Sequence, residues 1–262
     1  MKIATPISSL FTSQEQANEI VSWSDCLECR DHSPGSGWPN QELFHTDIQP
    51  IQPIAPEEWN QLRKIKETKP DLKLLSMHMV SCCDQPVLVK GRFESGGKTL
   101  GRDELLKTAK DNINRIRQLL GEKIGLAVEN NNYYPTPAYR FVCDADFISE
   151  IVRENQLRFL FDVAHAHITS TNQGIEYQHY KQQLPLEALM QVHLCKHGIR
   201  ENGQAYDAHE RPGIEEFQEV RDLASNYSLG YLTIEYYKST QGLVSILQES
   251  HKIKNEITGS VV

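Results

Sequence analysis

The chain has 262 residues, of which 39% are hydrophobic and 24% charged, and its formal net charge is −8. This composition is typical of a soluble globular protein and excludes a largely disordered chain. The negative charge disfavours binding to nucleic acid, and no apolar run approaches the ~18 residues that a membrane helix needs. Six cysteines are scattered through a chain too large to need disulfides, so we expect free thiols and a cytoplasmic protein.

Short apolar or β-branched runs alternate with helical patterns along the chain. Strands are predicted at residues 2–7, 26–30, 43–47, 73–79, 124–129, 158–163, 190–194 and 231–235. Helices are predicted between most of these runs, at residues 13–23, 56–67, 102–120, 144–155, 177–183, 214–225 and 242–253. About eight repeats of strand and helix predict a single (β/α)8 TIM barrel over residues 1–262, with parallel strands inside and helices outside.

Three segments depart from this alternation. Residues 31–40 (DHSPGSGWPN) are rich in Gly, Pro and Ser and predict a loop where a helix would otherwise follow the second strand. Residues 81–101 form a long connection with two adjacent glycines, Gly96 and Gly97, and we expect a lid over the barrel mouth there. Residues 257–262 are expected to form a flexible tail.

Residue types that bind metals stand at or just after six consecutive predicted strands. In such barrels the catalytic groups lie where strands end and the following loops begin. A single histidine at a strand end is more often structural than a ligand, but a repeated pattern indicates a shared centre. The candidate metal ligands are His45, His78, Glu129, Asp162, His165, His193, Asp207, His209 and Glu235.

The number and type of these ligands indicate more than one ion. Imidazole and carboxylate suit iron, zinc or manganese. Nine protein ligands are too many for one ion, whereas two or three ions bridged by carboxylates would use them and keep positions open for water, oxygen or substrate. Weaker candidates for substrate contact are Asn130, Asn131, Lys196 and His197, although a solvated loop explains the last two equally well.

Four segments together resemble a known family. They are VENNNYY, LRFLFDVAHAHITSTNQG, LMQVHLCKHG and GQAYDAHERPG. They resemble the multinuclear non-heme iron-dependent oxidative enzymes (MNIO) of the xylose-isomerase-like TIM-barrel superfamily, and the likeness runs from about residue 26 to residue 236. The positions that match the family's motifs are His45, His78, Glu129 with Asn130, Asp162 to His165, His193, Asp207 with His209, and Glu235.

The resemblance implies an oxidase or oxygenase. In such an enzyme two or three iron ions of mixed valence activate O2, and a substrate thiolate that coordinates one iron is oxidised. The implied substrate is a cysteine in a ribosomally made precursor peptide of natural-product (RiPP) biosynthesis, or else a small thiol or amine. Because the chain shows no added domain for recognising a leader peptide, a separate partner protein is expected to deliver the substrate.

His165 departs from the resemblance, because many family members carry Asn three residues after the aspartate. The D-x-x-H pattern is similar to that of endonuclease IV, a trinuclear zinc enzyme of the same superfamily, so Zn2+ remains an alternative to iron. Mn2+ is a further alternative because the same donor types suit it. Two other functions also stay open, a divalent-metal sugar isomerase or epimerase, in which Glu129 and Glu235 would hold the metal, and a zinc phosphodiesterase like endonuclease IV. The first needs only about four protein ligands for its one metal, and the acidic charge disfavours the second.

Overall fold

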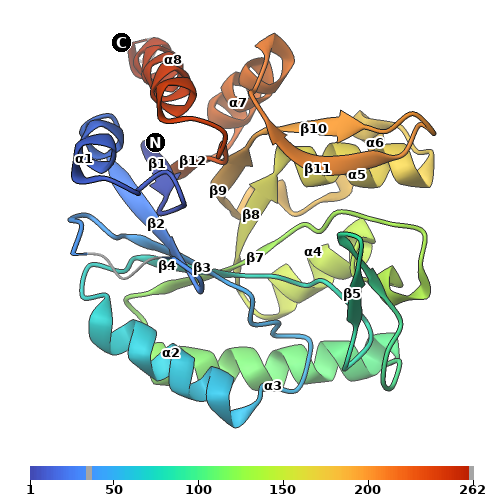
Figure 1. Cartoon of the computed structure of the whole chain (residues 1–262). Helices are drawn as coiled ribbons and strands as arrows, with labels where there is room; N and C mark the ends of the chain where they lie inside the picture. Colours follow the sequence, from blue (N-terminus) through green and yellow to red (C-terminus); the bar gives the residue numbers. More distant parts are fainter. Residues whose placement is uncertain (34–36, 260–262) are drawn as a thin grey trace.

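The computed structural model describes residues 1–33 and 37–259. Its centre is a closed barrel of eight parallel strands in the order β1-β12-β9-β8-β7-β4-β3-β2. The predicted (β/α)8 barrel is therefore confirmed (Figure 1). The barrel strands are β1 (Lys2–Pro6), β2 (Cys26–Arg30), β3 (Leu43–Thr46), β4 (Leu74–Met77), β7 (Gly125–Glu129), β8 (Arg158–Asp162), β9 (Leu189–Leu194) and β12 (Tyr231–Ile234).

The α-helices lie around the outside of the barrel (Figure 1). They are α1 (Gln14–Ser22), α2 (Pro56–Thr68), α3 (Arg102–Leu120), α4 (Ala145–Glu154), α5 (Val163–Gln173), α6 (Tyr177–Gln183), α7 (Ile214–Asn226) and α8 (Thr240–Gly259), with short 3-10 turns η1 (Pro137–Tyr139) and η2 (Leu186–Ala188). All seven predicted helices are present within a few residues of their expected bounds, except that α8 continues six residues past 253. Over the described part of the chain, no helix has both the length and the apolar character to cross a membrane.

The inner face of the barrel changes from apolar to polar along the strands. Near the strand starts a small apolar cluster fills the interior, made of Ala4, Cys26, Leu43, Leu74 and Ala127. Side chains two residues apart on a strand point to the same face. Leu43 is therefore followed on the inner face by His45, and Ala127 by Glu129. This alternation places polar groups at the end of the barrel where the strands finish, which is where such barrels carry their active sites.

Helix α5 was not predicted, and its burial explains why. Residues 163–170 are buried except for the partly buried His167, so the segment has no polar stripe with helical spacing. Its ends follow ordinary capping rules. The Asp162 side chain accepts a hydrogen bond from the His165 backbone N–H at 2.7 Å, and Gly174 ends the helix with φ 69° in the left-handed region that glycine adopts without strain.

Two antiparallel hairpins replace expected loops. Strands β5 (Val87–Val89) and β6 (Arg92–Glu94) pair within residues 81–101, and closure of this segment over the mouth stays a prediction. Strands β10 (Lys196–Ile199) and β11 (Ala205–Glu210) pair after β9. Within 31–40, the described residues contain no helix, and residues 34–36 lie outside the described part. Helix α8 includes residues 257–259 of the predicted tail; residues 260–262 also lie outside it.

Candidate metal centre

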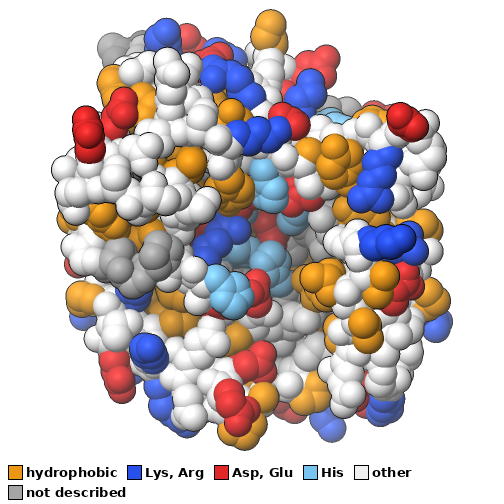
Figure 2. Space-filling model, viewed as in Figure 1, with side chains coloured by type: hydrophobic (Ala, Val, Ile, Leu, Met, Phe, Trp, Pro, Cys, Tyr) orange, Lys and Arg blue, Asp and Glu red, His pale blue; other side chains and the backbone are white. Residues whose placement is uncertain are grey.

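The barrel end where the strands finish forms a hollow that contains histidine and acidic side chains (Figure 2). Glu129 and Asp162 are the last residues of β7 and β8, and His45 and His193 lie within β3 and β9. His78 and Glu235 follow β4 and β12 directly. His165 is in the first turn of α5. Asp207 and His209 lie on β11 and not on a loop, as the sequence had suggested. The structure thus brings all nine candidates to one mouth.

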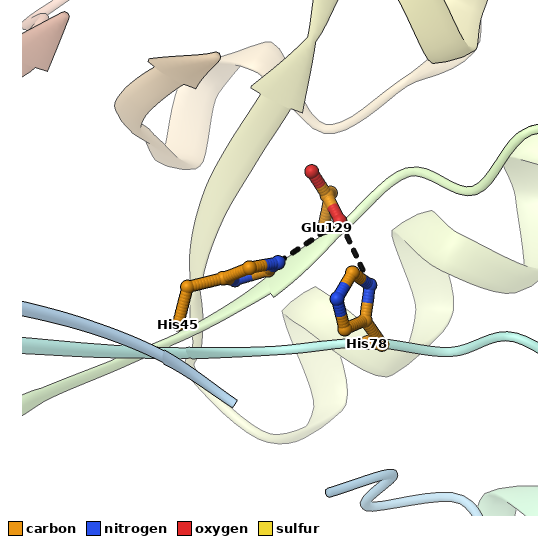
Figure 3. A group of neighbouring side chains, drawn as sticks. All are labelled: His45, His78 and Glu129. Carbon is orange, nitrogen blue, oxygen red and sulfur yellow. Dashed lines mark ion pairs between the residues drawn. The ribbon is translucent and has the colours of Figure 1, made fainter. Parts of the chain in front are cut away.

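Glu129 occupies the middle of the cluster. Its Oε2 lies 3.0 Å from His78 Nδ1 and 3.5 Å from His45 Nε2 (Figure 3). Its Oε1 lies 3.1 Å from His193 Nδ1 and 3.8 Å from His165 Nδ1. The two oxygens of one buried carboxylate therefore face two different sets of histidines. This is the arrangement that a carboxylate needs to bridge two metal ions.

The ring of His45 is held in the orientation of a metal ligand. Its Nδ1 lies 2.8 Å from Ser76 Oγ, while Nε2 is buried and has no hydrogen-bond partner among the described residues. A hydrogen bond at one ring nitrogen fixes the orientation of an imidazole whose other nitrogen binds a metal. Burial, together with the neighbouring His78, lowers the pKa of His45 to about 4. The ring is therefore neutral near pH 7, which is the form that binds a metal.

The two side-chain oxygens of Asp162 have different surroundings, one at the start of helix α5 and the other in the metal centre. Oδ1 caps α5, and the Asn130 side chain binds both the N–H and the C=O of Asp162 at 2.8 and 2.9 Å. Oδ2 is buried, has no hydrogen-bond partner in residues 1–33 and 37–259, and lies 3.9 Å from His193 Nδ1. Burial, and then repulsion by Glu129 and Glu235, raises the pKa of Asp162 to about 7. A bound cation would remove this cost.

Glu28 is a buried carboxylate of the centre that the sequence analysis missed. Its Oε2 lies 3.0 Å from His193 Nε2, on the opposite side of the ring from Glu129 and Glu235, which lie 3.1 and 3.2 Å from Nδ1. Burial acts to raise the pKa of Glu28, but His193 and Arg30 outweigh it and lower that pKa to about 2. A carboxylate behind a histidine is the usual support of a metal-binding imidazole.

Arg30 supplies a positive charge inside this part of the centre. Its guanidinium donates to Glu28 Oε1 at 2.7 and 3.1 Å and also contacts Glu235 Oε1. Glu28, His193 and Glu235 are close enough together to hold a metal ion. Because Arg30 already supplies one positive charge to the two carboxylates there, this group has less need of a metal ion. The geometry favours Glu28 as the partner that orients His193.

A separate group lies towards the β10–β11 hairpin. Asp207 Oδ2 is 3.3 Å from His209 Nε2 and 3.8 Å from His165 Nε2, and Glu235 Oε2 is 3.4 Å from His209 Nε2. The backbone of His209 has φ 45°, a conformation that is uncommon for residues other than glycine. Cys195, which sequence analysis treated only as a free thiol, joins Asp207 and His209 with all ligand atoms within 4.8 Å of one another.

Three of the four weaker candidates have other partners in the structure. Asn130 holds the backbone of Asp162, and the Asn131 side-chain amide donates to the carbonyls of Met79 and Val80 at 3.2 and 3.1 Å. Lys196 is exposed on β10. His197 stacks on His167, with ring centroids 5.0 Å apart. Their contact with substrate stays a prediction.

Glu28 can be tested by a conservative substitution. Glu28→Gln removes the charge behind His193 while keeping the size of the side chain, and we expect metal affinity to fall about 10- to 100-fold, the usual cost of losing such a support. Anaerobic titration of Fe2+ against a chromophoric chelator measures this. Glu42→Gln is the matched control, because Glu42 pairs with Lys2 at the opposite end of the barrel. Equal affinity in Glu28→Gln and the wild type would show that Glu28 does not support the ligand.

Comparison with known proteins gives one family and one fold. The profile of a family described as "RiPP precursor modification enzyme MbnB/TglH/ChrH" matches residues 100–257. A UPF0276 protein of Caulobacter sp. (strain K31) is 33% identical over 103 residues, which are 38% of this chain and 37% of the relative. A UPF0276 protein of Vibrio vulnificus (strain YJ016) is 22% identical over 192 residues, 68% of this chain and 65% of the relative. The matches span less than two thirds of either relative.

Solved structures share the architecture along almost the whole chain. The 3-keto-D-glucoside 4-epimerase of E. coli has a TM-score of 0.59 at 12% identity and covers 97% of this chain and 99% of its own. The D-psicose 3-epimerase of Clostridium cellulolyticum H10 has a TM-score of 0.55 at 11% identity, with coverage of 98% and 99%. These epimerases have the xylose-isomerase-like (β/α)8 fold. At such identities the likeness concerns the fold alone.

Proposed function

The chain belongs to the MbnB/TglH/ChrH family of RiPP precursor modification enzymes, and on this premise we propose that it oxidises a cysteine-containing peptide with O2 at a centre of two or three iron ions. The observation that carries the proposal is the position of Glu129, whose two oxygens face separate sets of histidines. Bridging by such a carboxylate is typical of multinuclear centres.

The negative charge at the mouth of the barrel supports the proposal that several cations bind there. Five carboxylates converge there, those of Glu28, Glu129, Asp162, Asp207 and Glu235, and Arg30 is the cation that contacts two of them. Buried carboxylates without compensating charge are costly. Divalent ions provide that compensation, and imidazole with carboxylate is a donor set that suits iron.

Three groups of residues would hold the ions. The first is His45, His78 and Glu129, and the second is Glu129, Asp162 and His193. The third contains Asp207 and His209, with His165 and Glu235 beside them. Bound iron would supply the redox chemistry that connects a substrate thiol with O2. The protein would hold the ligands in place through Ser76 behind His45 and Glu28 behind His193.

The ligand number favours this function over sugar epimerisation. An epimerase with one metal ion needs about four protein ligands, which Glu129, Asp162 and His193, with Glu235 beside them, could supply. That function gives no role to His45 and His78 or to the Asp207–His209 pair. An oxidative enzyme with several iron ions uses all of them.

The test uses protein purified without oxygen and loaded with Fe2+. A short synthetic peptide with one internal cysteine is the probe, and the same peptide with serine is its control. We expect O2 uptake and a mass change of the peptide only with iron and only with cysteine. Conversion of the cysteine peptide by the zinc form without O2 would contradict the proposal, and so would conversion of a ketose such as D-fructose by the Mn2+ form.

A further inference from the structure

Cys195 lies on the inner face of the barrel, next to the metal centre. It follows directly after β9, and residues two apart along a strand point to the same face. Cys195 therefore continues the inward row formed by Gln191 and His193. The side chain is free, and only 1% of its surface is exposed.

The β10–β11 hairpin explains how Cys195 meets residues that are 12 and 14 positions further along the chain. The two strands are antiparallel, and Lys196 pairs with Glu210, so the chain returns to the place where it left the barrel. The last part of β11 therefore lies next to the end of β9. Ligand atoms of Cys195, Asp207 and His209 all lie within 4.8 Å of one another.

One carboxylate oxygen of this group lacks a hydrogen-bond partner among the described residues. Asp207 Oδ1 is buried and has no hydrogen-bond partner within the described ranges, whereas Oδ2 faces His209 and His165. A buried carboxylate oxygen without a donor is costly. A cation placed between the sulfur, the carboxylate and the imidazole would satisfy all three groups at once.

We propose that the third metal ion is bound by the thiolate of Cys195 together with Asp207 and His209. As the ion binds, the sulfur–metal bond forms and the thiol proton leaves to solvent. This site would differ from the other two, whose donors are only nitrogen and oxygen. A thiolate prefers Zn2+, Co2+ or Fe2+ over Mn2+ and Mg2+, so the third site would select softer ions than its neighbours.

Co2+ is a suitable probe because its bond to a thiolate absorbs in the near ultraviolet. We expect such a band when metal-free protein is titrated with Co2+ under nitrogen, and a sulfur neighbour at about 2.3 Å in the X-ray absorption of zinc-loaded protein. Cys195→Ala should lose the band and one equivalent of bound ion. Cys26→Ala should keep both, because Cys26 is equally buried in the apolar cluster at the other end of the barrel.

Absence of the band and of a sulfur neighbour in fully loaded wild-type protein would overturn the inference, and so would an unchanged band in Cys195→Ala. The wild-type spectra decide the question even if Cys195→Ala does not fold, since Cys195 is the cysteine that the described residues place in a metal-binding group. The inference rests on the proposed metal centre but needs no turnover. A sulfur-ligated ion without thiol oxidation would therefore contradict the proposed function alone.

Discussion

Glu129→Gln is expected to remove the ions of the first two groups and to abolish activity. The substitution replaces one carboxylate oxygen with an NH2 group, which donates hydrogen bonds and does not bind a cation. The remaining oxygen can face the His45–His78 side or the His193 side, but not both. We expect activity to fall by more than about 100-fold, since losing even a hydrogen-bond partner of a ligand costs 10- to 100-fold.

Metal analysis and circular dichroism of Glu129→Gln test this expectation together. Glu42→Gln is again the matched control, because Glu42 bonds to Lys2 far from the mouth. The control should keep wild-type metal content. Glu129 would be structural if Glu129→Gln unfolds while metal-free wild-type protein stays folded, and it would not be a bridge if the variant keeps its full metal content.

Asp162→Asn is expected to lose metal and activity and yet to stabilise the metal-free protein. Asn is as good as Asp at capping a helix, so the bond from the His165 backbone N–H to the side-chain oxygen is kept. What disappears is a buried negative charge near Glu129 and Glu235. With metal present the order of stability should reverse, because bound ions stabilise the wild type by mass action.

The stability difference between metal-free Asp162→Asn and the wild type should depend on pH. The pKa of Asp162 is raised by burial from an ordinary value near 4 to about 7 in the folded protein. The stabilising effect of the protonated form is therefore complete below pH ~4 and is lost as the pH rises through ~7. The stability advantage of metal-free Asp162→Asn should thus be near zero at pH 4 and reach a few kcal/mol above pH 7.

Thermal unfolding of both metal-free proteins from pH 4 to pH 8 measures the difference. Asp146→Asn is a useful control, since Asp146 pairs with Arg102 on the surface. A variant that is less stable than the wild type at every pH, with and without metal, would show that the Asp162 carboxylate serves the fold and not the centre.

The sequence predicted the barrel because alternating strands and helices leave few other folds. It also predicted the nine candidate ligands, since strand ends such as those of Glu129 and Asp162 converge in any parallel barrel. Glu28 was missed because it lies inside a strand and not at its end. The period of two would have found it, because Cys26, Glu28 and Arg30 share the inner face.

Other features required the three-dimensional structure. Helix α5 is buried on almost every side, so its sequence has no amphipathic period. Cys195 meets Asp207 and His209 only because β10 and β11 form a hairpin. The segment between them contains Gly203, with φ 82° at the turn, but a turn signal alone does not tell which residues the two strands bring together.

Anomalous diffraction at the iron edge, from crystals of protein loaded with Fe2+ and kept without oxygen, would locate each bound ion. We expect two iron ions on opposite sides of the Glu129 carboxylate, one next to His45 and His78 and one next to Asp162 and His193. We expect a further ion beside Asp207 and His209. A single iron ion, or ions that do not contact Glu129, would contradict a multinuclear centre bridged by Glu129.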